Sequence, residues 1–104
     1  MSINIKTDKG WTEVVIDDNC GYEKFYQAAE LLKKDLQIEF FLKLNDFDSL
    51  YWDFKYKGSE LTLHYNIYMG ISVFPKVFAL ASDDDNEKVI EIGEFLFEKL
   101  NSIN

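Results

Sequence analysis

His64 and Cys20 are the first side chains to consider for chemistry, because they are the only histidine and the only cysteine of the chain. Together they could form a Cys–His nucleophilic pair, in which the imidazole activates the thiol. No motif around Cys20 is typical of an activated thiol, so we interpret Cys20 as a small buried thiol near a helix start and His64 as a polar residue on a sheet face. A zinc site needs about four such donors, and we therefore expect no metal and no cofactor.

Three consecutive carboxylates, Asp83, Asp84 and Asp85, precede Asn86 and Glu87 and could suggest calcium. The alternating oxygen ligands of a calcium loop, closed by a glutamate, are absent. Acidic residues at a helix start are instead explained by capping and by the helix dipole, and the spacing of Asp84 and Glu87 predicts a capping box. The same acids could still attract a basic partner.

A second acidic group, Asp46, Asp48 and Asp53, surrounds a predicted turn, with Tyr51 and Trp52 between its members. Paired carboxylates serve glycosidases and nucleases, but the pattern predicts neither the cleft nor the supporting residues. A turn whose carboxylates are solvated is the simpler interpretation. In a third interpretation, these carboxylates mimic phosphates and bind to a cationic active site. The chain also lacks a phosphate-binding glycine loop, a nucleophile elbow and a dinucleotide fingerprint, so we expect no enzymatic activity.

Composition limits the classes of partner. The 104 residues fit one domain, covering 1–104, and 47% hydrophobic residues favour a folded core over disorder. A formal net charge of -8 opposes direct binding to nucleic acid or to anionic membranes and favours a basic partner. The segment Met1–Lys6 lacks the apolar run of a signal peptide, and the single cysteine agrees with a reducing compartment, so we expect a cytoplasmic protein.

Two segments have the periodicity of amphipathic helices. Apolar residues recur at steps of three and four from Tyr22 to Leu36. The second helix is predicted to start near the Asp84 capping box and to run through Leu100. Gly93 lies in its middle and predicts a close crossing against the sheet, because a helical glycine otherwise costs about 1 kcal/mol.

Alternation with a period of two predicts strands at 12–16, 38–44, 50–56, 61–66 and 71–78. Short turns between the last four make them antiparallel neighbours. Pro75 predicts that the last strand is an edge strand or carries a bulge. The resulting order β-α-β-β-β-β-α predicts an α+β two-layer sandwich, with a mostly antiparallel sheet of about five strands and two helices on one face.

This packing predicts one covered and one open sheet face. The covered face is expected to carry Leu42, Trp52, Phe54, Leu63 and Val73. The open face is expected to carry Phe41, Tyr51, Asp53, Lys55, His64, Phe74 and Phe78. Aromatic rings grouped with charges are typical of a contact surface, although sheet twist or a terminus could also cover them.

The segments 51–56, 61–66 and 70–75 (YWDFKY, LTLHYN and GISVFP) resemble the strand core of small bacterial immunity proteins, including partners of contact-dependent growth-inhibition toxins and other polymorphic toxins. The strand LTLHY also resembles one in small bacterial domains of unknown function. The first resemblance implies a stoichiometric inhibitor, often of a nuclease, that acts by occlusion and has no catalytic residues.

Charge and aromatic content agree with that implication, because nuclease sites are basic and an acidic, aromatic-rich partner would associate with them quickly. We therefore expect an immunity protein that occludes a basic toxin domain. The alternatives are a homo-oligomeric adaptor and a small-molecule-binding domain, and the oligomeric state stays open. The predicted partner-binding residues are Asp46, Asp48, Tyr51, Asp53, His64, Asp83, Asp84 and Asp85.

Overall fold

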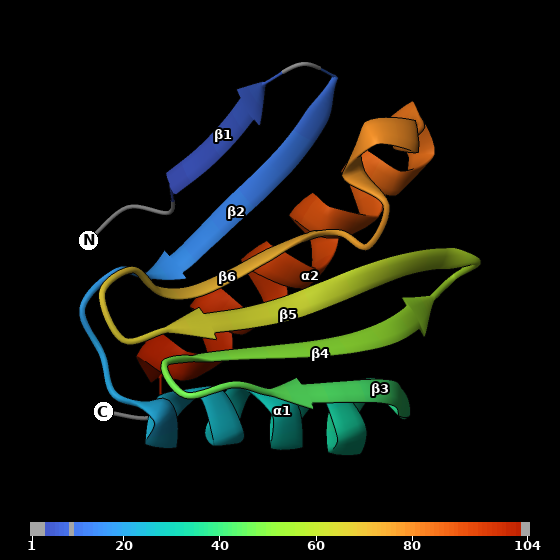
Figure 1. Ribbon diagram of the computed structural model, residues 1–104. Coiled ribbons are helices and arrows are strands. Elements are labelled where there is room, and N and C mark those ends of the chain that lie inside the picture. The colour runs from blue at the N-terminus through green and yellow to red at the C-terminus, as the bar shows by residue number, and fades with distance from the viewer. Residues whose placement is uncertain (1–3, 9, 103–104) are drawn as a thin grey trace.

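The computed structural model describes residues 4–8 and 10–102 and has the predicted α+β architecture (Figure 1). A six-stranded antiparallel sheet has the strand order β1-β2-β6-β5-β4-β3. The elements are β1 (Asn4–Asp8), β2 (Trp11–Asp17), α1 (Tyr22–Leu36), β3 (Phe40–Asn45), β4 (Ser49–Tyr56), β5 (Ser59–Asn66), β6 (Gly70–Pro75), the short 3-10 helix η1 (Phe78–Leu80) and α2 (Asp83–Ser102). The strand that the periodicity did not predict is β1, which forms a hairpin with β2.

Both helices pack on one sheet face, and the core lies between the two layers. Phe25 and Leu32 of α1 and Ile92 of α2 are fully buried, as are Phe54 and Val73 of the sheet. Helix α1 has the predicted bounds, and it ends where Gln37 adopts a left-handed conformation. None of the helices in the described ranges is long and apolar enough to cross a membrane.

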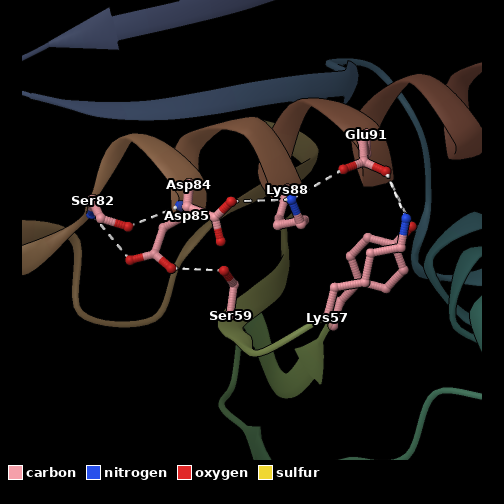
Figure 2. A network of polar contacts seen from close by, with 8 residues as sticks. Lys57, Ser59, Ser82, Asp84, Asp85, Lys88 and Glu91 are labelled. Carbon is pink, nitrogen blue, oxygen red and sulfur yellow. Dashed lines mark hydrogen bonds and ion pairs between the residues drawn. The ribbon is translucent and has the colours of Figure 1, made fainter.

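Helix α2 begins at Asp83, and its cap lies two residues before the predicted cap at Asp84. The capping box is formed by Ser82 and Asp85, not by Asp84 and Glu87: the Asp85 N–H donates to Ser82 Oγ at 3.1 Å and the Ser82 N–H donates to Asp85 Oδ2 at 3.0 Å. A serine hydroxyl reaches a backbone N–H three residues on, so the serine upstream of the acidic run acts as the cap. Figure 2 shows this pair at the start of the helix.

Gly93 marks the predicted close crossing of α2 over the sheet. A Cβ atom built on Gly93 would lie 2.4 Å from Cγ1 and 2.7 Å from Cβ of Val14, which is on β2. No real Cβ tolerates such contacts without movement of a neighbour. Glycine therefore lets the α2 backbone approach β2 directly.

The prediction that Pro75 marks an edge strand is wrong, because β6 lies between β2 and β5. The pairing of β6 with β5 is regular, and the register shift in its pairing with β2 lies in β2, between Val15 and Asp17, and not at Pro75. Pro75 is the last residue of β6 and lies opposite Leu61, whereas pairing with β2 ends at Val14 and Val73. The next N–H, of Lys76, donates to the Glu60 carbonyl at 3.0 Å. The missing N–H of the proline is thus tolerated at a strand end.

A bulge in the edge strand β3 overturns the predicted position of Leu42 under the helices. Phe40 pairs with Phe54, but Leu42 pairs with Asp53, so Phe41 is the extra residue. A one-residue shift exchanges the two faces of a strand. Leu42 is therefore 40% exposed on the open face, and Lys43 lies on the covered side with its Nζ 4.4 Å from the Trp52 ring centroid.

Candidate functional site

Two turns lie side by side at one end of the sheet, residues 46–48 between β3 and β4 and residues 67–69 between β5 and β6. The Asp46 N–H donates to the Ser49 carbonyl at 2.8 Å, and the Ile67 N–H donates to the Asp48 carbonyl at 3.1 Å. The side-chain amide of Asn66 donates to Ser49 Oγ at 2.9 Å. These bonds within and between the turns hold the backbone in a defined arrangement.

The two turns and the first turns of α1 enclose a groove of about 270 Å³, which we name the acidic–aromatic groove. Its exposed or half-exposed lining consists of Tyr22, Tyr26, Asp46, Phe47, Asp48, Leu50 and Ile67, above the buried Ser49 and Tyr65. The ring of Phe47 stands fully in solvent, with 101% relative exposure. Phe47 lines the groove together with the exposed Tyr22, Tyr26 and Ile67, and a group of exposed apolar side chains is typical of a binding surface.

The groove has carboxylates without an opposing cation. Asp46 Oδ1 accepts from the Phe47 N–H at 2.9 Å, and Asp48 Oδ1 accepts from the Ser49 hydroxyl at 3.2 Å. Both bonds are made by neutral donors, and no lysine or arginine is among the described residues that line the groove. Lys24, on the adjacent turn of α1, is paired with Asp17 at 2.6 Å. The negative charge of the groove is thus left for an external partner.

On the open sheet face, His64 lies between two rings. Its ring centroid is 4.5 Å from that of Tyr51 and 5.6 Å from that of Phe74, and His64 Nδ1 is 3.4 Å from Ser72 Oγ. Within the described chain, His64 Nε2 is buried without a hydrogen-bond partner. Burial lowers the pKa of His64 below its usual 6.5, and the charge of Glu13 only partly opposes this.

The open face is less open than the sequence predicted. Asp53 is only 6% exposed and accepts from the Thr62 hydroxyl at 2.5 Å, so its carboxylate does not face solvent. Large side chains on the neighbouring strands cover the middle of the face, which is why His64 and Phe74 are half-buried. A cavity of about 190 Å³ beside them carries both signs of charge; it is lined by Asn4, Lys6, Glu13, Val15, Asp18, His64, Met69 and Ser72.

The acidic run at the start of α2 is largely engaged within the chain. Asp85 Oδ1 also accepts from the Ser59 hydroxyl at 2.7 Å, and the backbone bond from Ser82 together with this one lowers the pKa of Asp85. Asp84 pairs with Lys88 at 3.3 Å. Figure 2 shows how this network continues through Glu91 to Lys57.

The two acidic clusters predicted to bind a partner lie at opposite ends of the molecule. Asp85 bonds to Ser59 at the start of β5, whereas Asp48 adjoins Asn66 and Ile67 at its end. Ser59 and Asn66 are seven residues apart on β5, a separation of about 23 Å along a strand. Of the predicted residues, the structure brings together Asp46 and Asp48 in the groove and Tyr51 and His64 on the open face, and it separates Asp83, Asp84 and Asp85 from both.

Cys20 and His64 do not form a nucleophilic pair. The carbonyl of Cys20 accepts from the Tyr65 hydroxyl at 3.3 Å on the helix-covered side, whereas His64, the preceding residue of β5, points to the other face. Burial, followed by the charge of Asp17, raises the pKa of the Cys20 thiol to about 11, so it is not an activated nucleophile. Within the described residues, no group of three or more His, Cys, Asp or Glu side chains could hold a metal ion.

The sequence did not predict four exposed residues of the groove: Tyr22, Tyr26, Phe47 and Ile67. The tyrosines were assigned to the buried face of the helix, because their spacing continues that of the core positions. Phe47 carried a usable signal, since it lies between two aspartates in a turn, where no strand or helix can bury it.

Comparison with known protein families identifies a family model that matches the chain. The family model described as "Protein of unknown function (DUF3630)" covers residues 2–101. No curated protein and no solved structure matches the chain. Because the matching model spans nearly the whole sequence, the chain belongs to the DUF3630 family.

Proposed function

We propose that this protein is a binding protein that docks a basic protein partner on the acidic–aromatic groove, and that its specific role is that of an immunity protein occluding a toxin domain. One observation carries the proposal: Phe47 is fully exposed between Asp46 and Asp48, at the rim of a groove lined by further exposed rings. The proposal places the protein in the cytoplasm, where a free cysteine such as Cys20 stays reduced.

Burying a large aromatic side chain is a common source of interface affinity, and such anchors concentrate near the centre of an interface. The formal net charge of -8 and the uncompensated carboxylates of the groove would steer a basic surface towards these anchors. A nuclease fits this description, because its active site must be positive to bind phosphates.

Self-association is a second candidate, and the edge strand β3 is the observation that favours it. Phe41, Leu42 and Leu44 are exposed on this six-residue strand, which has a sheet neighbour on one side only. An exposed apolar edge is a template for pairing with a second chain. Light scattering distinguishes the candidates: a dimer that Leu44→Lys converts to a monomer would support self-association, whereas a monomer at high concentration would exclude it.

The proposal is tested by co-expression with the protein encoded immediately upstream. The expected result is a one-to-one complex and rescue of growth from that protein's toxicity. Phe47→Ala is expected to weaken the complex about 30-fold, as for loss of a hot-spot anchor worth about 2 kcal/mol. Leu80→Ala is the matched control, because Leu80 is 80% exposed but follows the other end of β6. Absence of a complex, or equal effects of the two variants, would contradict the proposal.

A further inference from the structure

The two tyrosine rings of the groove, those of Tyr22 and Tyr26, pack against each other and against the aromatic core. The centroids of Tyr22 and Tyr26, one turn apart on α1, are 6.1 Å apart with an interplanar angle of 83°. Tyr26 in turn packs edge-on against Trp52 at 5.7 Å and against Phe25 at 5.8 Å. Tyr22 and Tyr26 line the groove and are therefore presented on a packed support, which lowers the entropic cost of binding.

The charged groups that line the groove favour a cationic ligand. The lining contains two carboxylates and no described cation, and the short bonds to Asp46 and Asp48 use one oxygen of each. Within the part of the chain that the structure describes, the second oxygens have no donor. The other candidate sites differ in this respect, because the cavity beside His64 includes Lys6 and the start of α2 is paired with Lys88.

We infer that the acidic–aromatic groove is a subsite for an arginine side chain of the partner, with the guanidinium stacked on the tyrosine rings and hydrogen-bonded to the free carboxylate oxygens. A guanidinium is planar, weakly hydrated and rich in donors, so it can stack and bond at the same time. A lysine ammonium would gain the charge attraction but not the stacking or the forked bonds. The inference rests on the proposed function and specifies the chemistry of the partner at this site.

The test uses N-acetyl-arginine methylamide as the probe, titrated into labelled protein while backbone amide shifts are followed by nuclear magnetic resonance. The expected result is saturable shifts confined to the amides of Tyr22, Tyr26, Phe47 and Asp48, with a Kd in the millimolar range that is typical of a single side chain (about 1 mM corresponds to about 4 kcal/mol). The citrulline analogue has the same shape without the charge and is expected to bind at least tenfold more weakly, with the lysine analogue in between.

Variants separate the subsite from general attraction to an acidic protein. The double variant Asp46→Asn and Asp48→Asn is expected to weaken the arginine probe at least tenfold, and Tyr22→Leu several-fold. Asp83→Asn removes a like charge at the far end of the sheet and should leave the affinity unchanged. Unchanged shifts outside the groove verify that each variant is folded. Equal affinity for arginine and citrulline, or an equal effect of Asp83→Asn, overturns the inference.

The outcome is independent of the test of the proposed function. If the upstream-encoded protein binds but the arginine probe does not shift the groove residues, the subsite inference fails and the proposed function stands. If the probe binds in the groove but the upstream-encoded protein forms no complex, the arginine subsite stands and the proposed function fails.

Discussion

Gly93→Ala tests the packing that the whole fold depends on. The new methyl group would lie 2.4 Å from Val14 Cγ1 and 2.7 Å from Val14 Cβ, and ordinary contact begins near 3.4 Å. Rotating the valine cannot relieve the contact with its Cβ, which is fixed by the β2 backbone, so α2 must withdraw from the sheet. Helix propensity favours alanine by about 1 kcal/mol, but overpacking of this kind costs about 1–3 kcal/mol.

Because two contacts fall below 3.0 Å, we expect the upper end of that cost and a net loss of about 2 kcal/mol in the free energy of unfolding. Urea unfolding, followed by circular dichroism and tryptophan fluorescence, measures this loss in the free energy of unfolding. Glu94→Ala, a change at an exposed neighbouring residue, is the control and should change the free energy of unfolding by less than about 0.5 kcal/mol. The double variant with Val14→Ala should lose about 1 kcal/mol less than the sum of the single losses. Stabilisation by Gly93→Ala, with additive effects, would refute the close crossing.

Three further changes test other parts of the structure. Ser82→Ala removes the cap that binds the Asp85 N–H and should destabilise the protein by about 1 kcal/mol in urea unfolding, and an unchanged midpoint would contradict the observed cap. Thr62→Val leaves the buried Asp53 carboxylate without its hydroxyl donor and should cost about 1–3 kcal/mol in the same assay, so a neutral effect would argue that Asp53 is solvated. Burial lowers the pKa of His64 from 6.5, so the fold favours the neutral imidazole. The contribution of the neutral His64 side chain to the free energy of unfolding is therefore present above pH 6.5 and is lost as the pH falls through the lowered pKa. In thermal unfolding at a series of pH values, His64→Gln should therefore lose less stability than the wild type as the pH falls below 6.5. Parallel curves of stability against pH for the two proteins would contradict this.

Periodicity predicted most of the fold because the helices and central strands bury one continuous stripe or face. Helix α1 was predicted to the residue, and Gly93 indicated the helix–sheet crossing. The strand β1 was missed because it is an exposed edge strand, whose residues Asn4 to Thr7 are exposed and so carry little burial pattern. The bulge at Phe41 was also hidden, since a bulge shifts the register without changing the sequence pattern.

The candidate site was predicted in part. Asp46 and Asp48 were identified from charge and turn position, and both line the groove. Their separation from Asp83 could not be predicted, because it depends on the path of β5 between the two ends of the sheet. Tyr22 has the spacing of a core residue, but it is the first residue of α1 and is exposed, whereas Phe25 is fully buried.

The central claim is that the acidic–aromatic groove is the surface that meets a basic protein partner. Hydrogen exchange of the complex with the upstream-encoded protein, compared with the free chain, tests it most directly, because slowed exchange maps the contact without a mutation. We expect slower exchange at residues 22–26, 46–49 and 66–69, with little change at residues 82–86. Protection confined to the start of α2 or to the open face around Tyr51 and His64, with the groove unchanged, would contradict it.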